Sequence, residues 1–191
     1  MIVSYIFNTP GAPPLADPPW TAQDGALGIN AGNYLEGQSM GFNVSYWNAD
    51  TFGPAQFSEF TLDASSVGAY QCLTLRNNGA DNYYFLWSNG SGDMHVQQNV
   101  AGSHNDIFNF PTMPYGLGDT VRVEIDSAFL MSFYLNNVFV FSYDDVSAPG
   151  ALAAGQPGVC EFGMAYGIAS WRGGDVAVPS NGGIFPFGGV S

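Results

Sequence analysis

The sequence predicts an all-β protein made of two antiparallel sheets packed face to face. No window of about 12 residues repeats apolar side chains at helical spacing without a Gly or Pro inside it. Short runs of alternating apolar and polar residues, bounded by turn residues, recur instead about every 10–15 residues. About ten or eleven short strands in a chain of 191 residues are typical of two packed sheets.

Each expected strand is a run in which successive side chains turn to opposite faces of a sheet. Two of the connections, 89–92 and Asn136-Asn137, are predicted to be tight hairpins because Asn and Gly tolerate a positive φ. The expected strands, in order, are 40–47, 56–62, 70–76, 82–87, 94–98, 120–125, 130–135, 138–143, 158–164 and 168–171.

The ends of the chain differ in composition from its centre. Residues 1–30 are expected to form an N-terminal strand and a Pro-rich arm, because 8–20 holds five prolines in thirteen residues. Residues 31–177 are expected to form the sandwich. Residues 178–191 form a Gly/Pro-rich C-terminal arm that is apolar where an ordinary linker is polar. The apolar residues expected to dock this arm onto a neighbouring subunit are Ile184, Phe185 and Phe187.

Charge excludes two classes of partner. Charged residues make up 10% of the chain, with no lysine, three arginines, 16 acidic residues and a net charge of −13. Neutralising nucleic-acid phosphates or an anionic membrane surface needs clustered Lys and Arg, so we expect no nucleic acid and no membrane as partner. The N-terminus lacks a basic signal-peptide region, and no apolar run has transmembrane length. We therefore expect synthesis without signal-peptide export, or a sequence that is already mature. The expected location is a virion or the extracellular space.

A family resemblance covers roughly residues 40–175. Residues 118–126 (GDTVRVEID), followed by 130–140 (LMSFYLNNVFV), resemble the strand pair "GDxxRxEx…LxxYxNGxxV" of concanavalin A-like (laminin G/laminarinase-type) jelly-roll domains. Residues 46–59 and 155–159 are similar to further segments of the same domains. The resemblance implies a two-sheet antiparallel jelly roll with extended arms and one concave face, the usual site for a glycan. Lectins, glycosidases and structural virion modules share this fold, so it does not choose among them.

The catalytic pattern of this family is incomplete. Laminarinase-type hydrolases use Glu-x-Asp-x-(x)-Glu, and Glu124-Ile125-Asp126 matches its first part, but Ser127, Ala128 and Phe129 follow where the second glutamate is required. The two histidines, His95 and His104, match no zinc spacing and are expected at the surface. We therefore expect a protein that is not an enzyme.

Metal and thiol chemistry remain open at this point. The family often carries a calcium ion near its terminal strands, and Asp175 and Asp50 are the candidate ligands. The alternative is that these carboxylates lie in solvated turns. Cys72 and Cys160 either form a disulfide or are two buried small side chains.

Aromatic residues carry the binding hypothesis. Sugars stack on Trp and Tyr, while Asn, Asp and Gln bind their hydroxyls. Tyr83, Phe85 and Trp87 share one face of a strand, and Trp47 and Tyr134 are candidates to extend it. The candidate ligand-binding residues are Trp87, Tyr83, Trp47 and Tyr134. The competing interpretation is that they fill the core.

Three functions follow, in order of preference. The first is a non-catalytic structural module on the surface of a phage-like virion, as a capsid decoration or fibre protein, held to other protein subunits by its arms. It accounts for the apolar arms and the absent signal peptide. The alternative is a carbohydrate-binding, lectin-like domain with calcium as a candidate cofactor. A glycoside hydrolase is the least favoured of the three.

Overall fold

The structure is a computed structural model that describes residues 1–7, 19–63, 70–88, 93–110, 114–146, 150–163 and 166–176. These residues form strands and one short 3-10 turn, η1 (Gly150–Leu152). The first strands are β1 (Ile2–Ile6), β2 (Trp20–Asp24), β3 (Leu27–Ile29), β4 (Leu35–Gly37) and β5 (Phe42–Trp47). They are followed by β6 (Gln56–Leu62), β7 (Tyr70–Asn77), β8 (Tyr83–Ser88), β9 (Met94–Val100) and β10 (Ser103–Phe110). The last are β11 (Thr120–Ile125), β12 (Leu130–Leu135), β13 (Val138–Asp144), β14 (Gln156–Phe162) and β15 (Tyr166–Asp175).

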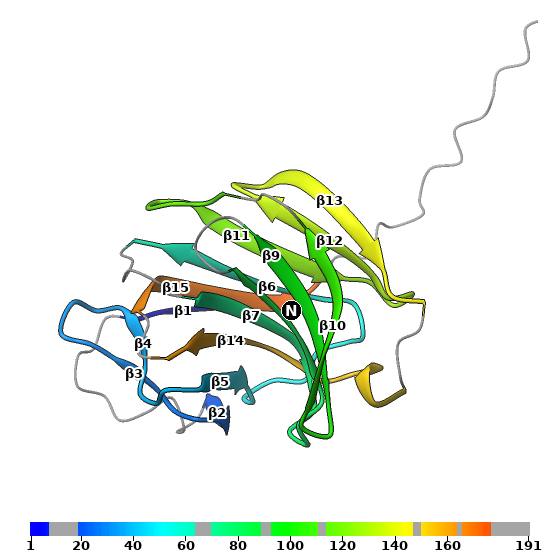
Figure 1. Ribbon diagram of the computed structural model, residues 1–191, viewed down its shortest axis with the longest axis horizontal. Helices are drawn as coiled ribbons and strands as arrows, with labels where there is room; N and C mark the ends of the chain where they lie inside the picture. The colour runs from blue at the N-terminus through cyan, green and yellow to red at the C-terminus, as the bar shows by residue number, and fades with distance from the viewer. Residues whose placement is uncertain are drawn as a thin grey trace, which may run out of the picture.

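The strands build two antiparallel sheets that pack face to face (Figure 1). Sheet A has eight strands in the order β13-β12-β11-β6-β15-β4-β3, and β1 also pairs with β15. Sheet B has seven strands in the order β10-β9-β8-β7-β14-β5-β2. Every pairing between described strands is antiparallel. The all-β, two-sheet prediction is confirmed.

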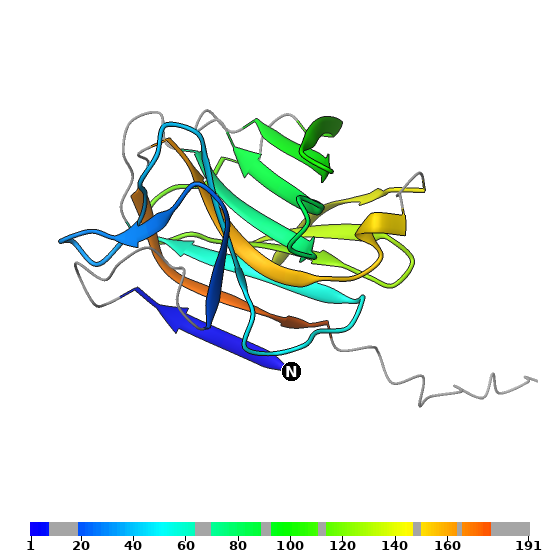
Figure 2. The ribbon, with the colours of Figure 1, turned by 90° about the horizontal axis from the view of Figure 1, so that it is seen from below.

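The described residues of 1–30 are hydrogen-bonded into both sheets. β1 lies along β15 in sheet A (Figure 2), and β2 pairs with β5 in sheet B. The boundary expected at residue 31 falls between β3 and β4, which pair with each other. The Pro-rich residues 8–18 and the C-terminal residues 177–191, with Ile184, Phe185 and Phe187, lie outside the described residues.

Alternation in the sequence explains most strands. In β11, Val121, Val123 and Ile125 are buried between the sheets while the residues between them are partly exposed. The turn at Asn136-Asn137 is confirmed, with φ of 52° and 63°. The expected hairpin at 89–92 lies outside the described part of the chain. β10 was not among the expected strands, because an edge strand with polar, exposed residues carries little apolar alternation.

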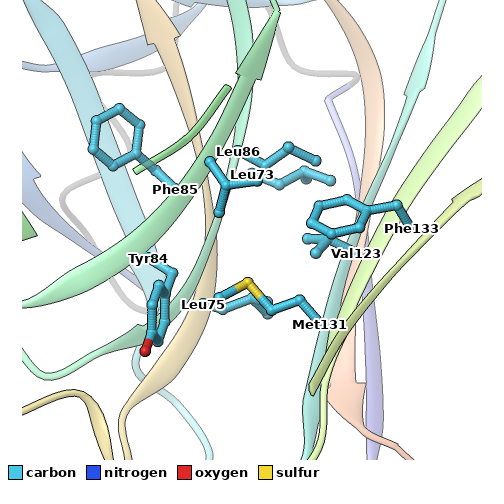
Figure 3. Close-up of a pocket in the computed structure, with 9 residues that line it drawn as sticks. Leu73, Leu75, Tyr84, Phe85, Leu86, Val123, Met131 and Phe133 are labelled. Carbon is cyan, nitrogen blue, oxygen red and sulfur yellow. The ribbon is translucent and has the colours of Figure 1, made fainter. Parts of the chain in front are cut away.

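The core between the sheets is closely packed. Leu73, Leu86, Val123 and Phe133 point toward one another from the two sheets, whereas Phe85 projects from the other side of β8 (Figure 3). The space that remains between them is about 10 Å³ and is lined by apolar groups, so it offers an ordered water no hydrogen-bond partners. No helix among the described residues has the length and apolar character to cross a membrane.

Candidate functional site

The outer face of sheet B, turned away from sheet A, carries an aromatic cluster. Along β8, Tyr84 and Leu86 join the core between the sheets, so Tyr83, Phe85 and Trp87 turn to the outer face. Burying one aromatic side of β8 in the core thus places the other aromatic side on the surface of sheet B.

Trp87 and three aromatic side chains from neighbouring strands line a hollow of about 140 Å³ on this face. The four are Phe42, Tyr70, Trp87 and Phe162. Phe42 is the register partner of Phe162 on β14, and Phe162 is the register partner of Tyr70 on β7. The ring centroids of Phe42 and Phe162 are 4.9 Å apart, and those of Phe162 and Tyr70 are 5.4 Å apart. Trp87 completes the hollow from β8, 5.3 Å from Tyr70. Three adjacent strands therefore supply one row of rings, and a fourth closes it.

These rings are partly exposed, unlike the core aromatics. Phe162 is 37% exposed, and Phe42, Tyr70 and Trp87 are intermediate. The edge-to-face contacts among the four hold them in a defined arrangement. The hollow is a preformed aromatic surface.

Both histidines of the chain border this cluster. His95 stacks on Trp87 with centroids 4.1 Å apart and planes at 9°. His104, on β10, lies 5.2 Å from Phe42 and 5.4 Å from Phe85. Trp87 Nε1 and His95 Nδ1 are buried without a hydrogen-bond partner among the described residues. The expected surface location fits exposed His104, whereas the ring of His95 is part of the aromatic surface.

Two cysteines lie in the neighbouring row of the same face. Cys72 and Cys160 are register partners on β7 and β14, both fully buried and both free thiols. Burial raises the pKa of both thiols, most of all that of Cys72. They are protonated small side chains beside the larger rings.

No lysine or arginine lies at the hollow. The chain has no lysine and three arginines. Arg76, near the end of β7, is buried, and its guanidinium donates hydrogen bonds to backbone carbonyls. Arg122 and Arg172 pair with Glu59 on sheet A. The hollow is therefore an apolar, aromatic surface without lysine or arginine, suited to stacking against the C–H face of a neutral ring.

Known structures share this architecture. The carbohydrate-binding module CBM66 from Bacillus subtilis matches with a TM-score of 0.58 and 16% identity over 80% of this chain and 94% of that one. The carbohydrate recognition domain of Emp47p matches with a TM-score of 0.55 and 13% identity over 85% and 93%. The potassium-bound domain of Emp46p has a TM-score of 0.52 and 12% identity over 84% and 90%. No protein-family profile and no curated protein matches the sequence.

The fold is a two-sheet antiparallel jelly-roll sandwich, as in these domains. The fold that the sequence resemblance implied is thus confirmed. Sequence identities of 12–16% show a shared fold and not a shared function. Within the jelly roll, only the surface geometry of this chain distinguishes a binding face from a structural one.

The four expected ligand residues lie in different parts of the jelly roll. Trp87 lines the hollow, and Tyr83 is on the same face but only 1% exposed. Trp47 lies between the sheets, where it packs against Trp20 and Trp171. Tyr134 is on the outer face of sheet A, near Phe139. The structure brings together two of the four, and of these only Trp87 offers a partly exposed ring.

The carboxylates of the two expected calcium ligands interact with N–H groups of the protein. Asp175 Oδ2 lies 2.7 Å from the α-amino nitrogen of Met1, and its Oδ1 accepts a hydrogen bond from the Gly53 N–H. Asp50 Oδ2 accepts a hydrogen bond from Trp47 Nε1 at 2.8 Å. The described residues hold no group of three or more His, Cys, Asp or Glu placed to bind a metal. The geometry of the residues that the structure describes therefore does not support calcium.

Glu124, the first position of the incomplete catalytic pattern, belongs to an ion-pair network on the outer face of sheet A. Its Oε1 lies 2.5 Å from Arg122 Nη2, and the same guanidinium lies 3.6 Å from Glu59. Arg122 also stacks on Phe57, 3.7 Å from the ring centroid. Asp126 lies in the next turn, where its Oδ1 accepts the N–H groups of Ala128 and Leu130. These carboxylates serve to join strands and to close a turn.

Sequence reasoning missed three of the four lining residues: Phe42, Tyr70 and Phe162. Alternation within each strand was the available signal, because Phe42 has the same parity as Val44, and Tyr70 has the same parity as Cys72. That signal shows that two residues share a face, but not that three strands place them side by side. Cross-strand register supplied the missing information.

Proposed function

We propose that this protein binds carbohydrate in the aromatic hollow on the outer face of sheet B. The observation that carries the proposal is the row of partly exposed rings, Phe42, Phe162 and Tyr70, closed by Trp87. Such rings bind the apolar face of a sugar, and the hollow of about 140 Å³ leaves room for a ligand against them. Similarity in fold to carbohydrate-binding domains adds support.

The ligand class we infer is a neutral glycan. No Lys or Arg lies at the hollow to pair with a carboxylate or sulfate, and the chain carries a net charge of −13. An acidic sugar would be repelled by the field of the whole protein and would find no compensating ion pair. Neutral hexose or pentose units meet neither penalty.

Replacing Trp87 by alanine is expected to lower glycan affinity at least about tenfold, because it removes one wall of the hollow. The matched control is Tyr134→Ala, which removes an aromatic ring from the other sheet and is expected to leave binding unchanged. Affinities are measured by calorimetry with the best ligand from a panel of neutral and acidic glycans. Because Trp87 is half-buried, Trp87→Phe and a thermal melt separate loss of the site from loss of the fold.

Three results would contradict this proposal. They are silence of the folded protein across the neutral panel, an acidic glycan as the best ligand, and equal losses in the Trp87 and Tyr134 variants. The virion-surface role stays a separate hypothesis. It depends on the arms expected within 1–30 and 178–191, of which 8–18 and 178–191 lie outside the described residues. No observation in the described residues favours it over glycan binding.

A further inference from the structure

The four rings of the aromatic hollow come from four adjacent strands of sheet B and meet at steep angles. The planes of Phe42 and Phe162 cross at 68°, those of Phe162 and Tyr70 at 89°, and those of Tyr70 and Trp87 at 71°. Rings that cross in this way cannot all lie in one plane. They form walls on several sides of the hollow, and such walls can surround a compact, rounded group.

The electrostatics of these walls favour a positive charge. The face of an aromatic ring is electron-rich, and a cation within about 6 Å of the ring centroid is attracted to it, most strongly by Trp. Neighbouring centroids in the hollow are 4.9, 5.4 and 5.3 Å apart, so one group held there lies close to several rings at once. The net charge of −13 also raises the concentration of cations near the chain.

Trp87 turns one of its faces toward the hollow. Its opposite face stacks on His95 of β9, with the two planes at 9°, and β9 lies on the side of β8 away from β7. The face that His95 does not cover is therefore directed toward β7, where Tyr70 lies 5.3 Å away. The ring with the strongest attraction for a cation thus contributes a face to the hollow.

The lining restricts the kind of cation that fits. A metal ion needs several oxygen ligands, and a primary ammonium needs three hydrogen-bond acceptors. The four lining side chains supply one oxygen, the Tyr70 hydroxyl, so either ion would lose its water there without replacement. A quaternary ammonium carries its charge beneath methyl groups, has no N–H to satisfy and is suited to aromatic walls.

We propose that the aromatic hollow of sheet B also binds a small quaternary ammonium ion of the choline type. The methyl groups pack against Phe42, Phe162 and Tyr70, and the charge lies against the face of Trp87 opposite His95. Charge complementarity selects this occupant, because the walls are electron-rich and the chain is strongly acidic. This ligand goes beyond the proposed function, since a neutral glycan uses the same rings without a charge.

The same argument separates a soluble choline ion from a choline lipid head group. Phosphocholine and phosphatidylcholine place a phosphate beside the ammonium, and the hollow has no Lys or Arg to pair with it. The net charge of −13 repels that phosphate. We therefore expect choline to bind more tightly than phosphocholine, and phosphatidylcholine vesicles not to co-sediment with the protein. Co-sedimentation with the vesicles would contradict the choice of a soluble ion.

Titration of the full chain with choline and with 3,3-dimethylbutan-1-ol tests the role of the charge. The two molecules have the same shape, and a carbon replaces the quaternary nitrogen in the alcohol. Imidazole gains a positive charge in acid, so calorimetry is done at pH 8. Choline is expected to bind at least about tenfold more tightly, with its methyl proton resonance moved upfield by the rings. Equal affinities, or no choline binding at about 10 mM, would overturn the proposal.

Phe162→Leu tests whether the ion lies in the hollow. Phe162 is 37% exposed, so leucine keeps an apolar side chain at the surface and removes one ring. Choline affinity is expected to fall about threefold or more, and affinity for the neutral alcohol to change little. Phe139→Leu, the matched control, makes the same change at a ring that is 55% exposed on β13, and choline binding is expected to persist. Equal choline affinities in the two variants would refute this site.

The result is separable from that of the glycan panel. Both ligands use one hollow, so saturating choline is expected to displace the best glycan, and simultaneous binding of the two would contradict a shared site. A protein that binds glycan and ignores choline would remove this inference alone. Choline binding without any glycan ligand would sustain the inference and remove the proposed function alone.

Discussion

Replacing Arg76 by methionine is expected to lower the free energy of unfolding by roughly 3 kcal/mol or more. Arg76 is fully buried, and its guanidinium donates hydrogen bonds to three loops. Nε and Nη2 donate to Pro54 O at 3.0 and 2.7 Å, Nη1 donates to Leu152 O at 3.1 Å, and Nη2 also reaches Asp126 O. Methionine fills a similar volume but leaves these buried carbonyls without a donor.

The size of this effect follows from how the positive charge is held. Arg76 is fully buried, and loss of hydration is costly for a cation, so burial lowers the pKa of this guanidinium. Carbonyl dipoles and the ring of Phe129, 4.3 Å from the guanidinium carbon, compensate that cost. Removing the guanidinium leaves several buried carbonyls without a hydrogen-bond donor and so lowers the stability of the fold. Removing an exposed arginine would change the stability little, because water replaces its contacts.

Chemical denaturation of the two proteins measures the loss. Arg76→Lys is the matched control, because it keeps the charge but lacks the planar fork that reaches several carbonyls at once. An intermediate stability is expected for lysine. A methionine variant within about 1 kcal/mol of the unmodified protein would show that the three loops do not depend on this side chain.

Replacing Glu161 by glutamine is expected to stabilise the fold at pH 8, and more so as the pH rises from 4 to 8. Glu161 is fully buried, and neither of its carboxyl oxygens has a hydrogen-bond partner among the described residues. Its register partners are Asn43 and Gln71, both uncharged. Burial, and then the nearby Cys72 thiol, raise the pKa of Glu161 well above its ordinary value.

The sign follows from proton linkage. The folded chain keeps Glu161 protonated at a pH where the unfolded chain has lost that proton. Its unfavourable effect is therefore absent below the pKa of the unfolded chain and grows by roughly 1 kcal/mol per pH unit above it, until the folded pKa is reached. Glutamine has a similar shape and no proton to lose, so it removes this dependence.

Denaturation at pH 4, 6 and 8 measures the difference between the two proteins. It is expected to be near zero at pH 4 and largest at pH 8. Glu36→Gln, at a partly exposed position on β4, is the matched control and is expected to show no such trend. Parallel pH profiles for Glu161→Gln and the unmodified protein would mean that Glu161 is solvated in the folded chain.

Much of the fold was predictable because each strand contains its own signal. β6, β11 and β12 were expected at the bounds that the structure shows. The missed strands β2, β3 and β4 are short, and β10 is polar, so their formation depends on neighbours that local propensity does not describe. Trp47 is a further example of what local sequence does not show. The alternation of its strand does not reveal that Trp20 and Trp171 pack against it.

The sequence by itself determined the all-β class, the two sides of each strand and the absence of clustered positive charge, because these depend on residue type and a period of two. Only the tertiary structure decided that Phe42, Phe162 and Tyr70 form one row closed by Trp87, and that Glu124 lies in an ion-pair network. Those arrangements depend on which strands pair and in what register. Register is a collective property of long-range packing, and a shift of one residue would send every one of these side chains to the opposite face.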